Sequence, residues 1–160
     1  MTLYTVTVIF LGTYLLWIEF AFVFISLYRD SKSRIRDFLS LFLSLLIVFL
    51  LARISGLFYT HLQPYVEQGF SPIIYHAPDN AFPADHATLS SALGFGLFLV
   101  SKETGLIALI MVLGICVGRV LGGVHYPIDV LAGIVLGIVA AYLARRIIYF
   151  IRSYKQMGDN

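Results

Sequence analysis

The stretch 81–88 places a carboxylate and an imidazole where a helix is expected to begin. Pro83 is the last helix-breaking residue before it, and Asp85 is suited to cap the helix that follows. His86 would then lie in the first helical turn, where backbone N–H groups without partners point toward any bound anion. The pattern therefore favours an anion-binding site that contains a titratable side chain.

A second stretch, 118–129, contains an arginine, a histidine and a carboxylate before the start of another helix. Arg119 ends one helix, two glycines form the turn, and Pro127 suits the first position of the next helix. His125 and Asp129 are four residues apart across this helix start, so they can face the same way. Both stretches open at the same end of the expected bundle, which could bring two histidines, an arginine and a carboxylate around one anion.

These two stretches resemble the motifs of a known enzyme family. The spacing of Arg119, His125 and Asp129 is similar to the R-x5-H-x3-D motif of the type-2 phosphatidic acid phosphatases, and 83–86, P-A-D-H, resembles their P-S-G-H motif. The longer strings F-P-A-D-H and H-Y-P-I-D-V are similar to F-P-S-D-H and H-Y-P-x-D-V. Those strings are typical of the undecaprenyl-diphosphatase branch associated with bacitracin resistance. The resemblance covers roughly residues 50–142.

The resemblance implies a role for each of these side chains. His125 would attack phosphorus and form a phosphohistidine, while Asp129 would orient its ring and stabilise its positive charge. His86 would protonate the leaving oxygen, and Arg119 would bind the phosphate oxygens through two donors. The charge of a transferring phosphoryl group is spread over its oxygens, so such donors suit the reaction, and the scheme needs no metal ion or other cofactor.

The sequence departs from the family at two places. The first family motif is K-x6-R-P, but Gln63 stands here where its arginine is usual, and Arg53 and His61 are the nearby candidates to supply charge. Ala84 replaces the serine of the second motif, which removes a hydroxyl donor but leaves the backbone N–H. The candidate phosphate-binding residues are Arg119, Ala84, Asp85, Arg53, His61 and Gln63.

Other interpretations of the same side chains remain open at this point. A histidine at a helix start can serve as a cap or as an interfacial polar residue, although the joint spacing argues against this for the group. A metal site is a second alternative, but its residue spacings match no zinc template. The residues in question are His76, Asp79, His86, His125 and Asp129. His76 and Asp79 could also contact a lipid headgroup or be plain loop residues.

The composition indicates which elements must position these groups. Of 160 residues, 59% are hydrophobic and 12% are charged, far from the balance of a soluble domain. This composition excludes a disordered chain, a nucleic-acid-binding arm and a secreted disulfide scaffold, since Cys116 is the single cysteine. We expect one integral-membrane domain over residues 1–160, with the bilayer and a lipid as its partners and no nucleic acid.

Five apolar runs could cross a bilayer as helices, because a span takes about 20 residues. They are 3–28, 38–59, 87–100, 106–121 and 128–151. The third and fourth are short for a span, which suggests that they are tilted or enclosed by longer neighbours. The fold class predicted is therefore all-α, a polytopic transmembrane helical bundle of about five spans.

The charges are divided between the two sides of this predicted bundle. Connections on one side hold nine of the eleven Lys and Arg residues, including Lys155, which makes that side cytoplasmic by the positive-inside rule. The other side holds the 26-residue segment 60–85, expected to be non-helical, and all four histidines: His61, His76, His86 and His125. We therefore expect a cell-membrane protein with its site on the extracytoplasmic face.

Two further patterns concern the interior of the bundle. Glycines at positions 114, 118 and 122, and at 133 and 137, recur every four residues and predict close packing between the fourth and fifth spans. Glu19 is an ionisable residue inside the first span, which makes it a functional candidate or a neutral group hydrogen-bonded between helices.

Taken together, the sequence predicts a metal-independent lipid phosphatase, with undecaprenyl diphosphate as the preferred substrate. A phosphatase for phosphatidylglycerophosphate or phosphatidic acid is the first alternative. A non-catalytic lipid-binding or transport protein on the same fold is the second, although the retained His86, His125 and Asp129 argue against it.

Overall fold

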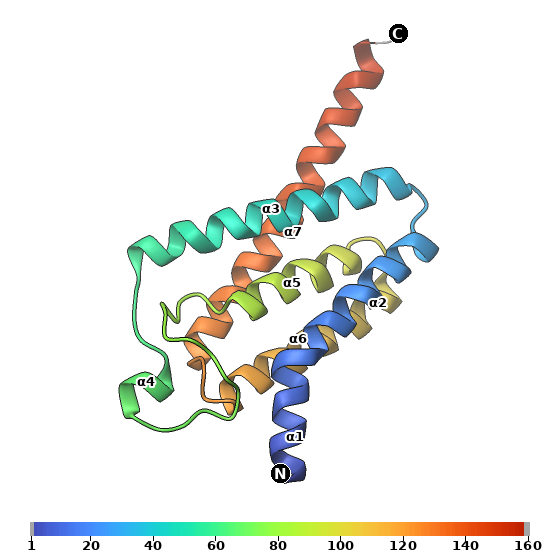
Figure 1. The fold of residues 1–160 in the computed structure, drawn as a ribbon. Coiled ribbons are helices and arrows are strands. Elements are labelled where there is room, and N and C mark those ends of the chain that lie inside the picture. Colours follow the sequence, from blue (N-terminus) through green and yellow to red (C-terminus); the bar gives the residue numbers. More distant parts are fainter. Residues whose placement is uncertain (1, 159–160) are drawn as a thin grey trace.

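The computed structural model describes residues 2–158, with side chains up to Tyr154, so the side chain of Lys155 lies outside the described part. No strand occurs among these residues, which confirms the predicted all-α class. The first long helix consists of α1 (Leu3–Ile9), the π-helical segment η1 (Phe10–Tyr14) and α2 (Leu15–Asp30). It bends where these segments meet (Figure 1). Such π-helical turns occur mostly as short insertions in α-helices, often at functional sites.

A helix lies at each of the five predicted spans. After the first come α3 (Arg34–Phe58), α5 (Asp85–Phe98), α6 (Lys102–Leu121) and α7 (Pro127–Gly158). Among the described residues, four helical stretches are long and apolar enough to cross a bilayer, and the remaining helix, α5, has only 14 residues. The chain is a multi-pass membrane protein.

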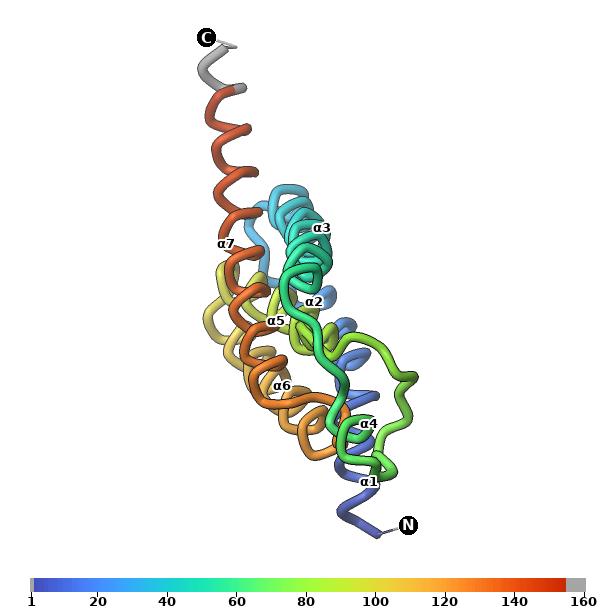
Figure 2. The backbone as a smooth tube through the Cα atoms, turned by 90° about the vertical axis from the view of Figure 1, so that its left-hand side faces the viewer, coloured from blue at the N-terminus to red at the C-terminus, as the bar shows by residue number. Residues whose placement is uncertain are grey.

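The short helix α5 lies at the centre of the bundle. It packs most extensively against α7 and α6 and also contacts α3 and α2 (Figures 1 and 2). Its buried positions are mostly small or weakly polar, as in Ala87, Ser90, Ser91 and Ala92. Because neighbouring helices cover it on several sides, the helix can be shorter than the hydrocarbon core that its neighbours cross.

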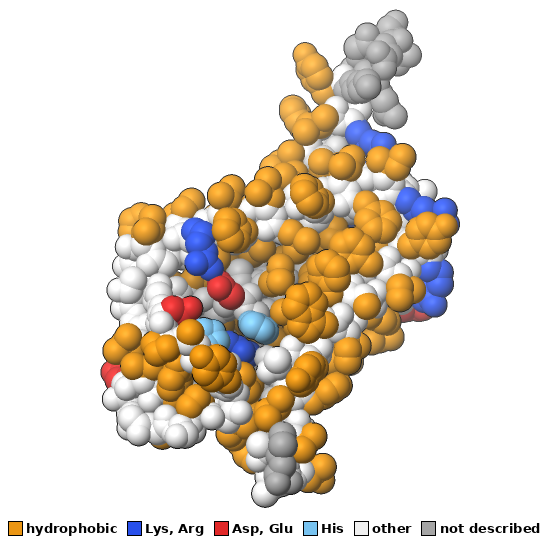
Figure 3. Space-filling view, in the orientation of Figure 1, with side chains coloured by type: hydrophobic (Ala, Val, Ile, Leu, Met, Phe, Trp, Pro, Cys, Tyr) orange, Lys and Arg blue, Asp and Glu red, His pale blue; other side chains and the backbone are white. Residues whose placement is uncertain are grey.

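The outer surface of the bundle is apolar, as expected for a surface that faces lipid. Trp17, Phe42 and Leu57 are strongly exposed, and hydrophobic side chains cover most of the face in Figure 3. Small and polar residues such as Ser44 lie inside instead. Small residues let helix backbones approach closely where lipid provides no hydrophobic force to drive the helices together.

The glycines do permit close helix packing, but the predicted partner was wrong for all five of them. A Cβ atom on Gly118 would lie 2.4 Å from the backbone nitrogen of Gly12, so α6 packs against the first helix there rather than against α7. Gly133 and Gly137 of α7 instead meet Thr88 and Ser91 of α5. Periodicity identifies a face that needs close approach, but it does not identify the helix that approaches.

The loop between α3 and α5 folds back over one end of the bundle (Figure 2). It contains α4 (Pro64–Gln68), so the prediction of a wholly non-helical segment was wrong for these five residues. Ile74 is buried against Val8 and Val124, and the Ile73 N–H donates to the Gly122 carbonyl at 3.0 Å. The loop is thereby packed onto the turn that precedes His125.

Basic residues and histidines gather at opposite ends of the bundle. At the basic end Arg145 of α7 lies 3.7 Å from Asp37 of α3, and Arg152 donates to Ser33 at 3.4 Å. His76, His125 and Arg119 lie near one another at the other end, where histidine, arginine and acidic side chains gather around a hollow (Figure 3). The predicted grouping of the charges is thus present in the fold.

Candidate active site

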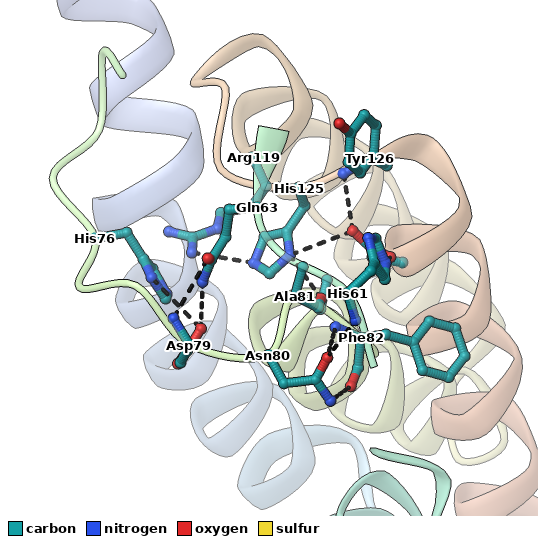
Figure 4. Close-up of polar contacts among 12 residues, drawn as sticks. His61, Gln63, His76, Asp79, Asn80, Ala81, Phe82, Arg119, His125 and Tyr126 are labelled. Atoms are coloured by element: carbon teal, nitrogen blue, oxygen red, sulfur yellow. Dashed lines mark hydrogen bonds and ion pairs between the residues drawn. The ribbon is translucent and has the colours of Figure 1, made fainter. Parts of the chain in front are cut away.

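His125 lies in the turn between α6 and α7 and is only 4% exposed. Its Nδ1 is 3.0 Å from the Ala81 carbonyl oxygen, and its Nε2 is 3.3 Å from the Nη2 atom of Arg119 (Figure 4). A carbonyl can only accept and a guanidinium can only donate, so these contacts place the ring proton on Nδ1 and the lone pair on Nε2. The imidazole is held as the tautomer that can act as a nucleophile through Nε2.

Arg119 is 2% exposed and reaches His125 from the last turn of α6. Its Nη1 donates to the Gly12 carbonyl at 3.5 Å, beside the π-helical turn. Its Nε has no hydrogen-bond partner within residues 2–158. A buried donor of this kind is uncommon in a folded protein, and an anion would satisfy it.

The turn that carries His125 has a conformation that needs glycine. Gly123 has φ of +77°, and a Cβ atom there would lie 2.7 Å from the ring of Phe70. The predicted glycine turn is therefore present, and the loop side chain packed on it leaves no room for a larger residue.

Asp129 is fully buried and serves two partners closer than His125. Its Oδ2 accepts from the backbone N–H of Tyr126 at 2.8 Å, which caps the start of α7, and its Oδ1 lies 2.7 Å from Nε2 of His61. The distance from Oδ2 to Nδ1 of His125 is 3.8 Å. The carboxylate therefore lies beside the ring of His125 but shares its oxygens with His61 and the backbone.

His86 is half-buried in the first turn of α5, as predicted. The backbone N–H groups of Asp85 and His86 have no acceptor within the described part of the chain. The electrostatic neighbours of the His86 ring include Arg119, His125 and His76. The two motif histidines and Arg119 thus act on one another across the same hollow.

The remaining residues of the second motif are engaged with other parts of the protein. Ala84, rather than Asp85, is the N-cap position of α5, so the predicted capping role of Asp85 was wrong. The N–H of Ala84, expected to bind phosphate, donates to the Asp129 backbone carbonyl at 3.1 Å, because α5 and α7 begin side by side. Both oxygens of Asp85 accept from Arg53, at 2.8 and 2.9 Å, on the exposed surface.

The residues expected to replace the first family motif also have partners. Gln63 is fully buried, and its amide donates to Asp79 while the Asp79 N–H donates back at 3.3 Å. His61 contacts Asp129 as described, and Arg53 contacts Asp85. The fold therefore brings His61 into the His125 cluster, whereas Gln63 joins the two ends of the loop.

Two aromatic side chains and His76 complete the surroundings. The His76 and His125 rings meet edge to face with centroids 5.9 Å apart, and the Tyr65 hydroxyl donates to the His76 carbonyl at 2.6 Å. The Tyr126 hydroxyl donates to Glu67 at 2.6 Å, and this hydrogen bond raises the pKa of the phenol. Tyr126 therefore stays neutral at the mouth of the site.

The residues considered as an alternative metal site are not grouped as a set of metal ligands in the described structure. Among residues 2–158, no three His, Cys, Asp or Glu side chains are grouped so that they could share a metal ion. Glu19 lies apart from the site, fully buried in the bundle, where Ser90 of α5 donates to Oε2 and the other oxygen has no partner in the described structure. Its contact matches the predicted hydrogen bond between helices.

Sequence reasoning missed the contact between His61 and Asp129, which are 68 residues apart. No spacing rule links them. The one available signal was that His61 and Asp129 were both expected at the same end of the bundle.

The chain is similar in sequence to proteins of one family. A model described as the PAP2 superfamily matches residues 37–153. The bacitracin transport permease protein BcrC of Bacillus licheniformis is 32% identical over 136 residues, which cover 84% of this chain and 66% of that protein. The undecaprenyl-diphosphatase BcrC of Bacillus subtilis is 31% identical over 98 residues, which cover 61% and 51%. The chain thus spans between half and two thirds of the length of these relatives.

A solved structure has the same fold. The chain is similar to the first transmembrane PAP2 type phosphatidylglycerolphosphate phosphatase from Bacillus subtilis, with a TM-score of 0.63 and 20% identity. The superposition covers 89% of this chain and 74% of that one.

Proposed function

Because this chain belongs to the PAP2 superfamily, we propose that it is a membrane phosphatase that hydrolyses a lipid diphosphate, with undecaprenyl diphosphate as the preferred substrate. The observation that carries the proposal is the buried pair of His125 and Arg119. The Nε2 lone pair faces a guanidinium whose Nε donor has no partner in the described structure. A phosphate bound by Arg119 would present its phosphorus to this nitrogen.

The first step is attack of His125 Nε2 on the terminal phosphorus. A bond forms between nitrogen and phosphorus, the bond to the bridging oxygen breaks, and undecaprenyl phosphate leaves with a proton from His86. Arg119 and the free N–H groups at the start of α5 stabilise the charge on the phosphoryl oxygens. The positive charge that develops on the imidazole is stabilised by the Ala81 carbonyl and by Asp129.

The second step is hydrolysis of the phosphohistidine. His86, now without its proton, takes a proton from water, and the hydroxide attacks phosphorus. The bond between nitrogen and phosphorus breaks, inorganic phosphate leaves, and His125 recovers its lone pair. No metal ion takes part in either step.

The names of the relatives support two interpretations of this site. One relative is named as an undecaprenyl-diphosphatase, which matches the proposed reaction, while the other is named as a transport permease. A transport role would not require an imidazole with an unprotonated nitrogen beside a buried guanidinium. The His125 tautomer therefore favours hydrolysis.

We also place the site on the extracytoplasmic side of the cell membrane. This assignment follows from the basic end of the bundle, which the positive-inside rule assigns to the cytoplasm. The apolar tail of the substrate would stay in the bilayer while its diphosphate reaches the hollow that contains His86 and His125.

Release of phosphate by purified protein in detergent tests the reaction. With EDTA present, undecaprenyl diphosphate, phosphatidylglycerophosphate and phosphatidic acid are supplied in separate reactions, and we expect the fastest release from the first. His125→Ala should lower release by about 10⁴-fold or more, as the loss of a nucleophile does. His125→Ala that matches the wild type would overturn the proposal, and release that needs a divalent cation would favour a metal site.

Labelling of intact cells tests the orientation. A cysteine at Gln68, exposed in α4, should react with an impermeant thiol reagent added outside, whereas a cysteine at Lys32 at the basic end should react only after lysis. The native Cys116 is buried and gives a low background. If only the cysteine at Lys32 reacts in intact cells, the proposed orientation is wrong and the opposite one holds.

A further inference from the structure

A cavity of about 640 Å³ lies at the basic end of the bundle, far from His125. It opens between the carboxyl-terminal part of α7 and the end of α5, and its lining includes Arg145, Arg146, Tyr142, Tyr149 and Phe150. Nothing in the proposed reaction uses these residues. The question is which ligand a lining of two guanidinium groups and three aromatic rings would accept.

The charges around this cavity are not balanced by the protein. Arg36 lies 3.0 Å from Asp37, and Arg145 lies 3.7 Å from the same carboxylate. Both guanidinium groups also lie over the ring of Tyr149, at 4.5 and 5.2 Å from its centroid. Arg146 is exposed, stacks on Tyr142, and has no carboxylate partner among residues 2–154. Arg36 and Arg145 share the single charge of Asp37, and Arg146 is unpaired among residues 2–154, so two positive charges remain for an anionic ligand.

The wall of the cavity is apolar and continuous with the lipid-facing surface. Phe150 is 72% exposed and Tyr142 is 50% exposed, and both belong to the same helix as the arginines. Aromatic and basic side chains at the end of a span lie at the level of the lipid headgroups. A ligand here would meet cations at one end and hydrocarbon along its side, which is the chemistry of a phospholipid rather than of a free phosphate.

We propose that this cavity binds an anionic phospholipid of the leaflet at the basic end, with its phosphate at Arg145 and Arg146 and an acyl chain against Tyr142 and Phe150. Basic pockets between spans bind such headgroups on the cytoplasmic side of membranes. Arg146 is the seventeenth residue after Asp129 on α7, a rise of about 25 Å. The bound lipid is therefore a different molecule from the substrate at His125.

Lipid binding to purified protein in detergent tests the proposal without any substrate. Phosphatidylglycerol and phosphatidylcholine with the same chains are titrated separately, and bound lipid is measured by native mass spectrometry. We expect saturable binding of phosphatidylglycerol only. Arg146→Gln should raise its dissociation constant about fivefold, which corresponds to the value of one basic residue at an anionic surface.

Arg34→Gln is the matched control, because it removes one arginine from the same end of the bundle, outside the cavity. Arg34 lies over Tyr28 and donates to its carbonyl, and we expect binding within about twofold of the wild type. An equal loss in both variants would overturn the proposal, because it would indicate nonspecific attraction. Unchanged binding in Arg146→Gln, or equal binding of both lipids, would also overturn it.

Arg145→Gln provides a second test within the cavity. It should weaken phosphatidylglycerol binding as well, and thermal unfolding monitors any damage from the loss of its contact with Asp37. Phosphate release by Arg146→Gln in detergent should equal that of the wild type. A failure to bind phosphatidylglycerol would therefore not contradict the proposed phosphatase reaction. A failure to release phosphate would likewise not contradict the proposed lipid site.

Discussion

Each end of the bundle contains a buried carboxylate that joins segments far apart in the sequence, and the two carboxylates differ in their partners. Asp37 accepts from Ser31 at 2.7 Å and from Arg36 at 3.0 Å, and Arg145 of α7 lies 3.7 Å away. Asp129 instead contacts the imidazole of His61 and the Tyr126 N–H, with His125 at 3.8 Å.

The difference lies in what the partners can do with a proton. A guanidinium stays charged at any physiological pH, so the Asp37 cluster is a fixed contact between α3 and α7. An imidazole can both donate and accept a proton through its two ring nitrogens, so the partners of Asp129 can take part in the proton transfers that a reaction requires. Two carboxylates that are similarly buried thus have different roles. Asp37 holds α3 and α7 together, and Asp129 belongs to the site of the proposed reaction.

Among substitutions at the two ends, replacement of Asp129 should cause the largest loss of phosphate release. Asp129→Asn removes the negative charge beside both histidines, and we expect phosphate release to fall about 10³- to 10⁴-fold, as the loss of the carboxylate does in a Ser-His-Asp triad. The measurement is kcat with undecaprenyl diphosphate at saturating substrate. A loss below tenfold, with a folded protein by circular dichroism, would contradict a role for Asp129 in the reaction.

Arginine-to-lysine substitutions at the two ends should also differ in their effect on kcat/KM, but by a smaller factor than the substitution of Asp129. Arg119→Lys keeps the charge but loses the planar set of donors, so we expect kcat/KM to fall about 10²-fold. Arg36→Lys at the basic end is the matched control and should stay within about twofold. Equal effects would mean that both arginines serve only the fold.

His61→Ala should have an intermediate effect, about tenfold on kcat, because it removes one partner of Asp129 and leaves His125 in place. A double-mutant cycle with Asp129→Asn distinguishes its route of action. If His61 acts through the carboxylate, its removal should cost little more once Asp129 is replaced. Fully additive losses would instead indicate direct contact of His61 with phosphate.

Asp37→Asn should have the smallest effect on activity and a clear effect on stability. We expect kcat within about twofold of the wild type, because the contact lies at the opposite end from His125. We also expect a loss of about 2 kcal/mol in the free energy of unfolding, since the half-buried Arg36 and Arg145 lose the counter-charge of Asp37. Thermal unfolding in detergent measures the change in stability. A large loss of kcat in an Asp37→Asn protein that is fully folded would show that the two ends are coupled.

Most of the helices could be predicted from the sequence because apolar runs of this length have few alternatives. The short third run was expected to be either tilted or enclosed by longer neighbours, and α5 is enclosed by them. The helix α4 was missed, although Pro64 at its first position and Gly69, with φ of +69°, are usual boundary signals. Five residues are too few for a hydrophobic period to be visible.

The site was predictable only where its residues are close in sequence. His125 and Asp129 share one helix start, so their spacing constrains their geometry. The partners of Gln63 and His61 depend on how the loop folds back, and no local pattern encodes that path. The same reason explains why the contact of the Ala84 N–H with the backbone of α7 was not predicted.

The central position of α5 has a consequence for the biogenesis of the protein. A helix of 14 residues rises about 21 Å, less than the bilayer core of about 30 Å, so it is a poor span on its own. Its most extensive contacts are with α7, which is made after α5 and α6. The segment that carries His86 therefore lacks its main packing partner until α7 has been made, and chains interrupted before α7 should be substrates for membrane quality control.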